Sequence, residues 1–320
     1  MTIEELLNTQ PEVINLLRNA KRKNKLVHGY LFEGDSGTGT LEAAKYLAMM
    51  LLCKEDIPCL KCNTCERIIY NSHLNVVLIE PIGDIIRKEQ IENLMHDFSY
   101  TAAEAGPQIY IIKDCEKMNQ SAANSLLKFL EEPAPDHYAI LTTTNKARLL
   151  PTIISRLQHI HFKPIGTTYI MNELIKEDVD NDLAYITSHI TNDIVEARKY
   201  ATEGKLAKII NLALRIATAR FRRKDPYVEY YLNKNILFDE NIKTWHFIFL
   251  DTLILINKEL LLKASIDSAN HFKNNLDNIR SDQIDKKTIL NKLDIINEYE
   301  ERLNFNVNID LLYASLFTQI

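Results

Sequence analysis

The sequence predicts an α/β domain built on a parallel sheet, followed by domains made only of helices, and three observations lead to this. The apolar segment 30–32 runs into a glycine-containing loop, and a helical segment follows the loop. Further apolar segments alternate with helical ones as far as residue 162. After Pro164 no strand-like segment follows. Strands that alternate with helices are typical of a doubly wound parallel sheet.

The individual elements of the first domain follow from local patterns. Residues 11–24 are predicted to form a helix with Val13, Leu16 and Leu17 on one side. Pro133 fits the end of the last predicted helix of this domain, because proline cannot continue a helix. The predicted strands are 30–32, 76–79, 109–112, 138–142 and 159–162, and the helices between them include 87–98 and 120–131.

The chain is predicted to have three parts: an α/β domain at 1–164, a small helical domain at 165–205 and an all-helical domain at 206–320. Residues 166–203 show short helical segments with polar breaks, whereas later segments are longer. One of these, 286–303, carries apolar residues at helical spacing, namely Ile289, Leu290, Leu293, Ile296 and Leu303.

Composition excludes several classes of protein. With 320 residues and 46% hydrophobic content, the chain is long and apolar enough for a core and is not disordered. A formal net charge of -5 gives no indication of non-specific nucleic-acid affinity. The N-terminus lacks the pattern of a signal peptide, and the most apolar later stretch, 245–256, is shorter than the ~20 residues of a membrane span. We expect a cytoplasmic protein without membrane contact.

The glycine loop has the spacing of a phosphate-binding loop without its reactive side chains. Gly34 and Gly39 lie at the spacing G-x-x-x-x-G, with Gly37 between them. In a working loop a lysine and then a serine or threonine follow, and these contact the phosphates and Mg²⁺. Here the two positions are Thr40 and Leu41. Leucine cannot bind Mg²⁺, which requires oxygen ligands. We therefore expect no productive Mg-ATP binding.

A second position supports the same interpretation. A nucleotide-hydrolysing domain of this type carries an acidic pair after the strand at 109–112, where the first acid helps to hold Mg²⁺ and the second activates water. The pair here is Lys113 and Asp114. A lysine places positive charge where a carboxylate is required, so two separate positions have lost their metal-handling groups.

Four cysteines lie within thirteen positions: Cys53, Cys59, Cys62 and Cys65. In a long cytosolic chain such a cluster indicates metal binding rather than disulfides. Four thiolates are the ligand set of a structural zinc site. The competing interpretation is an iron–sulfur cluster, but the cysteine-proline pair of the ferredoxin pattern is missing. The zinc module is expected at about 53–65, with Cys53 at the end of the preceding helix.

Several segments together resemble the AAA+ clamp-loader subunits of bacterial DNA polymerase III. HGYLFEGDSGTGT resembles the start of their AAA+ domain, and the cysteines occupy the place of their zinc module. KMNQSAANSLLKFLEEP (117–133) resembles their helix with the signature NALLK-LEEP. LTTTN (141–145) resembles the sensor 1 strand, and ISRLQHIHF (154–162) resembles the SRC segment. The detailed match covers residues 28–163.

The resemblance implies a fold and a function. It implies an AAA+ P-loop domain, a small helical lid domain and a C-terminal helical collar that joins subunits in a ring. In this family the gamma/tau subunits hydrolyse ATP, and the changes at 40, 41 and 113 favour a non-catalytic member. In relatives the arginine of the SRC segment is an arginine finger toward the ATP of a neighbouring subunit. The resemblance implies this role for the matching residue Arg156, rather than a surface ion pair alone. The expected partners are the gamma/tau and delta subunits and, through the complex, the sliding clamp and primer–template DNA.

Two other functions compete with this interpretation. The first is an active ATPase of the gamma/tau type, which Thr40, Leu41 and Lys113 oppose. The second is a zinc-dependent nucleic-acid-binding module, which the acidic net charge opposes.

Overall fold

The computed structural model describes residues 1–99, 104–132, 134–237 and 242–320, which form two compact units with their boundary at residues 165 and 166. Each unit has its own hydrophobic core. The predicted Pro133 helix end lies outside the described residues. The predicted three-domain division, 1–164, 165–205 and 206–320, stays a prediction.

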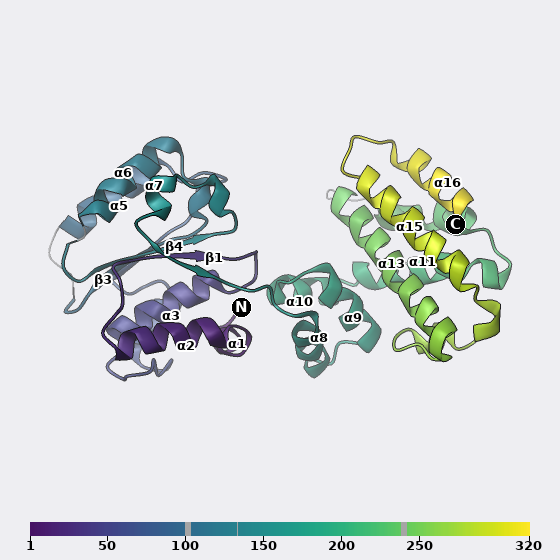
Figure 1. Ribbon diagram of the computed structural model, residues 1–320, viewed down its shortest axis with the longest axis horizontal. Helices are drawn as coiled ribbons and strands as arrows, with labels where there is room; N and C mark the ends of the chain where they lie inside the picture. Colours follow the sequence, from purple (N-terminus) through teal and green to yellow (C-terminus); the bar gives the residue numbers. More distant parts are fainter. Residues whose placement is uncertain (100–103, 133, 238–241) are drawn as a thin grey trace. The chain divides into compact units, whose positions relative to one another are not determined.

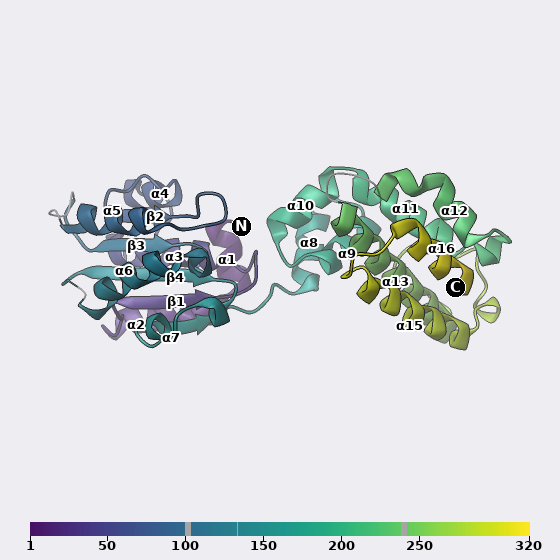
Figure 2. The same cartoon turned by 90° about the horizontal axis from the view of Figure 1, so that it is seen from above.

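A five-stranded sheet forms the centre of the first unit, in the order β2-β3-β4-β1-β5. Every neighbouring pair is parallel, and Figure 2 shows β2, β3, β4 and β1 in this order. The strands are β1 (Gly29–Glu33), β2 (Val76–Ile79), β3 (Gln108–Ile112), β4 (His137–Thr143) and β5 (Gln158–His161). The structure thus confirms the five predicted strands and the predicted α/β class.

Helices cover both faces of this sheet (Figure 1). Successive side chains of a strand point to opposite faces, so Tyr30 and Phe32 join the core on one side and Leu31 joins the core on the other. One face packs against α1 (Ile3–Thr9), α2 (Pro11–Arg22), α3 (Thr40–Leu52) and α4 (Asn63–Ile69), and the other against α5 (Lys88–Ser99), α6 (Gln120–Glu131) and α7 (Pro151–Ile154). Because both faces of the sheet are covered, the central strands β1, β3 and β4 are largely buried and mostly apolar, whereas the edge strand β5 is polar and exposed except at Ile160.

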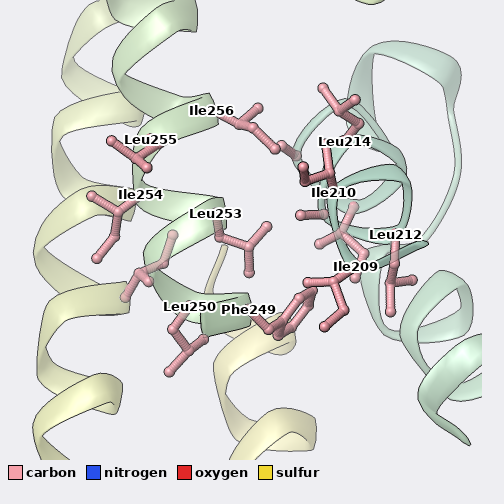
Figure 3. Packing of buried hydrophobic residues seen from close by; sticks show 14 of the residues in the cluster. Ile209, Ile210, Leu212, Leu214, Phe249, Leu250, Leu253, Ile254, Leu255 and Ile256 are labelled. Atoms are coloured by element: carbon pink, nitrogen blue, oxygen red, sulfur yellow. The ribbon is translucent and has the colours of Figure 1, made fainter. Parts of the chain in front are cut away.

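The second unit contains helices and no strand among its described residues. Its α-helices are α8 (Thr167–Lys176), α9 (Asn181–Ile190), α10 (Ile194–Thr202), α11 (Lys205–Ala217), α12 (Pro226–Asn233), α13 (Ile242–Ile266), α14 (Lys273–Leu276), α15 (Lys286–Arg302) and α16 (Ile309–Gln319). Ile209 and Ile210 of α11 face Phe249 and Leu253 of α13 in its core (Figure 3). No helix within the described ranges is long and apolar enough to cross a membrane.

Two leucines that the sequence places on the apolar sides of predicted helices are exposed in the structure. Leu16 is 45% exposed, and α2 buries Val13, Ile14 and Leu17 instead. Leu290 is 50% exposed, although it lies in an otherwise apolar pattern. A helix turns by ~100° per residue, which places Leu290 outside the buried side of α15.

The same helical periodicity places Lys292 on the buried side of α15, three residues after the buried Ile289. Lys292 is 7% exposed and forms no hydrogen bond or ion pair with the described residues. Burial, with a smaller contribution from the positive charge of Arg220, lowers the pKa of Lys292 to about 8. The folded chain therefore pays a desolvation penalty whenever this lysine is charged.

We predict that Lys292→Met stabilises the protein near pH 7. The folded pKa lies below the unfolded value of about 10.4, so the unfolded chain binds more protons between these values and the stability of the wild type rises with pH across this window. The substitution should raise the free energy of unfolding at pH 7 by roughly 1–3 kcal/mol and flatten that rise. Urea unfolding at pH 7 and pH 9.5 measures both effects. Lys286→Met, at an exposed position of the same helix, is the control, and equal stability of the two variants would contradict the assignment.

Candidate functional site

The glycine loop joins β1 to α3 and has a conformation that requires glycine at three positions. A side chain at Gly34 would meet Thr38 Oγ1 at 2.5 Å and Phe162 Cβ at 2.8 Å. Gly37 and Gly39 have positive φ angles of 81° and 87°. The side chain of Gln10 fixes the loop, since its Nε2 donates to the carbonyl oxygens of Thr38 (3.2 Å) and Lys163 (2.7 Å). The loop therefore has a defined shape.

The two residues after the loop provide no group that handles a phosphate–magnesium pair. Thr40 is the first residue of α3, and Gly39 precedes it as the N-cap. Leu41 packs against the hydrophobic core next to α3. The helix N-terminus still directs backbone N–H groups toward the loop, but a lysine ammonium is missing at position 40 and an oxygen ligand is missing at position 41.

The acidic pair expected after β3 is replaced by two residues that are held in ion pairs. Lys113 Nζ lies 3.0 Å from Glu80 Oε1, and this hydrogen bond raises the pKa of Lys113 above its usual value. Lys113 is therefore charged at neutral pH. Asp114 has a left-handed backbone with a φ of 52°, and its Oδ2 lies 3.3 Å from Lys117 Nζ. Neither residue presents an unpaired carboxylate.

Glu116 links the segment after β3 to the end of β4. Its Oε1 accepts hydrogen bonds from Thr144 N (3.2 Å) and Thr144 Oγ1 (2.8 Å). Burial alone would raise the pKa of Glu116, but hydrogen bonds from Thr144 and Thr143 keep it below its usual value. This carboxylate therefore links Thr144, in the predicted sensor 1 segment, to the segment that follows β3.

The four cysteines come together in the structure. Their sulfur atoms all lie within 4.8 Å of one another, and Cys53 Sγ is 3.9 Å from Cys59 Sγ. Cys53 caps the C-terminus of α3, as predicted, and Cys62 caps the N-terminus of α4. One tetrahedral zinc ion with Zn–S bonds of about 2.3 Å holds its sulfurs about 3.8 Å apart. The cluster therefore fits a single metal ion, whereas a cluster of several metal atoms would hold its cysteine sulfurs farther apart.

The thiol groups of this cluster differ in acidity. A hydrogen bond from the backbone of Lys61, and a second from Cys62, lower the pKa of Cys59 to about 7. Burial raises the pKa of Cys65 above its ordinary value. A thiolate is the form that binds metal, so Cys59 is already poised as a ligand, whereas Cys65 would lose its proton on metal binding. The solitary Cys115 is buried away from this cluster.

Arg156 lies between α7 and β5 and docks against α6. Its Nη2 donates to Glu131 Oε1 at 2.7 Å, and its Nη1 donates to the carbonyl oxygen of Thr152 at 2.8 Å. About a third of the side chain stays exposed. The next residue, Leu157, replaces the cysteine of the SRC segment and packs closely against Gly29, as a packing residue should.

The structure adds Glu80, which sequence reasoning missed, and a role for Glu131, which the sequence showed only as part of the signature at 117–133. Each is the ion-pair partner of a residue that the sequence did single out, Lys113 and Arg156. Glu80 follows β2, and Glu131 ends α6. Both partners are distant in sequence, and no local pattern identifies such pairs.

Comparisons with known proteins agree on one family. The family model described as DNA polymerase III, delta subunit, matches residues 9–166. The DNA polymerase III subunit delta' of Bacillus subtilis is 35% identical over 321 residues, covering 98% of this chain and 96% of that protein. The delta' subunit of Pseudomonas aeruginosa is 35% identical over 134 residues, covering 40% of this chain and 41% of that protein. The tau subunit of Bacillus subtilis is 32% identical over 170 residues, covering 52% of this chain and 30% of that protein.

Proposed function

The chain belongs to the family of DNA polymerase III delta' subunits, and we propose that it acts as a non-catalytic subunit of the clamp-loader complex, which places the sliding clamp on primed DNA. The observation that carries this proposal is the 35% identity to a delta' subunit along almost the whole of both chains. Its partners in the complex are the gamma/tau and delta subunits. It meets the clamp and the primer–template DNA as part of that complex, in the cytoplasm.

The proposal that this chain does not hydrolyse ATP rests on three side chains. Thr40 replaces the phosphate-binding lysine, Leu41 replaces the magnesium ligand, and Lys113 replaces an acid at the metal position. Lys113 is charged and paired with Glu80, so it would repel Mg²⁺. The fold is kept while the chemistry of its own site is lost.

We predict that the isolated chain binds ATP without any dependence on Mg²⁺, and weakly. Calorimetric titration with ATP, with and without Mg²⁺, measures this. A tight interaction that requires Mg²⁺ would contradict the proposed loss of the site. A matched titration of the tau subunit, whose family members hydrolyse ATP, shows that the assay detects a working site.

Arg156 is proposed to act in trans on the ATP of a neighbouring subunit. It lies on the surface at the end of α7, with about a third of its side chain exposed. A guanidinium has a fixed positive charge that stabilises the charge on a transferring phosphoryl group. A subunit that cannot hydrolyse ATP itself can therefore still complete the site of its neighbour.

The proposal is tested by reconstituting the complex with its tau and delta subunits and measuring ATP hydrolysis stimulated by clamp and primed DNA. An arginine finger contributes about 10³–10⁵ in rate at its own site, but the other sites of the complex keep their own residues. We expect Arg156→Ala to assemble normally and to lower the stimulated turnover at least about three-fold. Failure of the wild-type chain to assemble would refute the subunit assignment. Normal turnover by an assembled Arg156→Ala complex would refute the finger alone.

We also propose that the four-cysteine cluster binds one structural zinc ion. The sulfur spacing and the set of four thiols support zinc, and no carboxylate or open ligand position is needed. Cys53, Cys59, Cys62 and Cys65 would close the site. When bound, the ion cross-links the end of α3 to the start of α4 and stabilises the fold rather than taking part in a reaction.

We predict that the purified chain contains about one zinc per molecule, in keeping with a closed four-thiolate site. Cys65→Ser should lose most of the metal and unfold at a lower temperature, because one ligand and one buried sulfur are removed. Elemental analysis and thermal unfolding measure the two effects. Cys115→Ser, which alters a buried cysteine outside the cluster, should keep the metal. Equal zinc content in both variants would exclude Cys65 as a ligand.

A further inference from the structure

Glu131 is the last residue of α6, and its carboxylate holds the guanidinium of Arg156. The Nη2–Oε1 distance is 2.7 Å, which is typical of a charge-assisted hydrogen bond. The carbonyl oxygen of Thr152 accepts from Nη1 on the opposite side, at 2.8 Å. Two acceptors from two different helices therefore fix a side chain that has four rotatable bonds when it is unrestrained.

A carboxylate is an unfavourable choice for the last turn of a helix. The C-terminus of a helix carries partial negative charge, which favours Lys, Arg or His and disfavours Asp or Glu. Glu131 occupies this position in α6 and has Arg156 as its ion-pair partner. The pair offsets the unfavourable interaction of the carboxylate with the helix end.

The hydrophobic core beneath this pair holds the backbone next to both residues. Leu130 precedes Glu131 and is 2% exposed, and Leu157 follows Arg156 and is 9% exposed. Both belong to the same hydrophobic cluster as the fully buried Ile153 of α7. The residue next to each member of the ion pair is buried in the same core. The carboxylate and the guanidinium therefore lie close together on backbone that is already held in place.

The pair leaves part of the guanidinium available. Arginine has five N–H donors. The structure shows hydrogen bonds from Nη1 and Nη2 to acceptors of this chain and none from Nε to a described residue. The exposed remainder of the side chain can therefore donate to the phosphate oxygens of an incoming partner while the carboxylate still holds the other edge.

We propose that Glu131 is a positioning residue, which holds Arg156 in the orientation that it presents to the triphosphate of a neighbouring subunit. The ion pair fixes the arginine before the subunits meet, so less conformational entropy is lost when the neighbouring site is completed. This inference rests on the proposed trans action of Arg156. It differs from that proposal in predicting that a residue which does not contact the nucleotide controls the turnover.

The test compares Glu131→Ala, Glu131→Gln, Arg156→Ala and the double variant Glu131→Ala/Arg156→Ala in the reconstituted complex. We expect Glu131→Ala to lower the stimulated kcat by about two- to five-fold and to leave the KM for ATP unchanged, because the neighbour's own loop binds the nucleotide. Glu131→Gln should recover much of the loss, since its amide oxygen still accepts a hydrogen bond. The double variant should be no slower than Arg156→Ala, because both changes act through the same arginine.

A matched ion pair elsewhere provides the control for a general structural effect. Glu177 Oε1 lies 2.7 Å from Arg198 Nη2, and these side chains are 41% and 32% exposed, close to the values for Glu131 and Arg156. Glu177→Ala should leave turnover unchanged. Wild-type or increased turnover by Glu131→Ala, beside a defective Arg156→Ala, would overturn the positioning role and leave the arginine finger intact. Full activity of Arg156→Ala would instead remove the proposed function on which the inference depends.

Discussion

The parallel register of the five strands is the constraint on which the arrangement of the first unit depends. In a parallel sheet all carboxyl ends meet at one edge and all amino ends at the other. The glycine loop follows β1, Lys113 follows β3 and Thr144 follows β4, so these residues gather at the carboxyl edge. Arg156 precedes β5 instead and belongs to the amino edge. The sheet therefore separates the site that we propose has lost its nucleotide chemistry from the arginine that we propose acts on a neighbouring subunit.

The residues at the carboxyl edge are compatible with the fold even though they differ from those of a nucleotide-hydrolysing site. Two of the three residues that stand in place of a reactive group, Leu41 and Lys113, have a structural contact in the folded chain. Leu41 packs against the core, Lys113 pairs with Glu80, and the neighbouring Asp114 pairs with Lys117. The charges of Lys113 and Asp114 are partly exposed and paired, so they cost the domain little stability. The shape of the loop follows from its glycine geometry and from the hydrogen bond that the side chain of Gln10 donates to it.

The cysteine cluster and the Glu131–Arg156 pair each connect two segments at the surface of the first unit, and they do so by different interactions. The cluster lies between the end of α3 and the start of α4, beside the core, and four thiols can close it around one ion. The ion pair joins the end of α6 to the segment after α7, where a hydrophobic core already holds both backbones. In both cases the fixed group lies on a well-packed element, which keeps its geometry defined.

The sequence by itself determined the features that depend on neighbours along the chain. The five strands, the glycine loop, the clustered cysteines and the replaced residues at 40, 41 and 113 are all visible as local patterns, because strand alternation, turn chemistry and ligand spacing act over a few residues. Only the tertiary structure decided which residues meet across the fold. The burial of Lys292, the exposure of Leu290 and the pairing of Glu80 with Lys113 and of Glu131 with Arg156 depend on which helices and strands pack together. Helical periodicity gives the direction of a side chain but not the identity of the element that it faces, so these contacts could not be predicted from the order of residues.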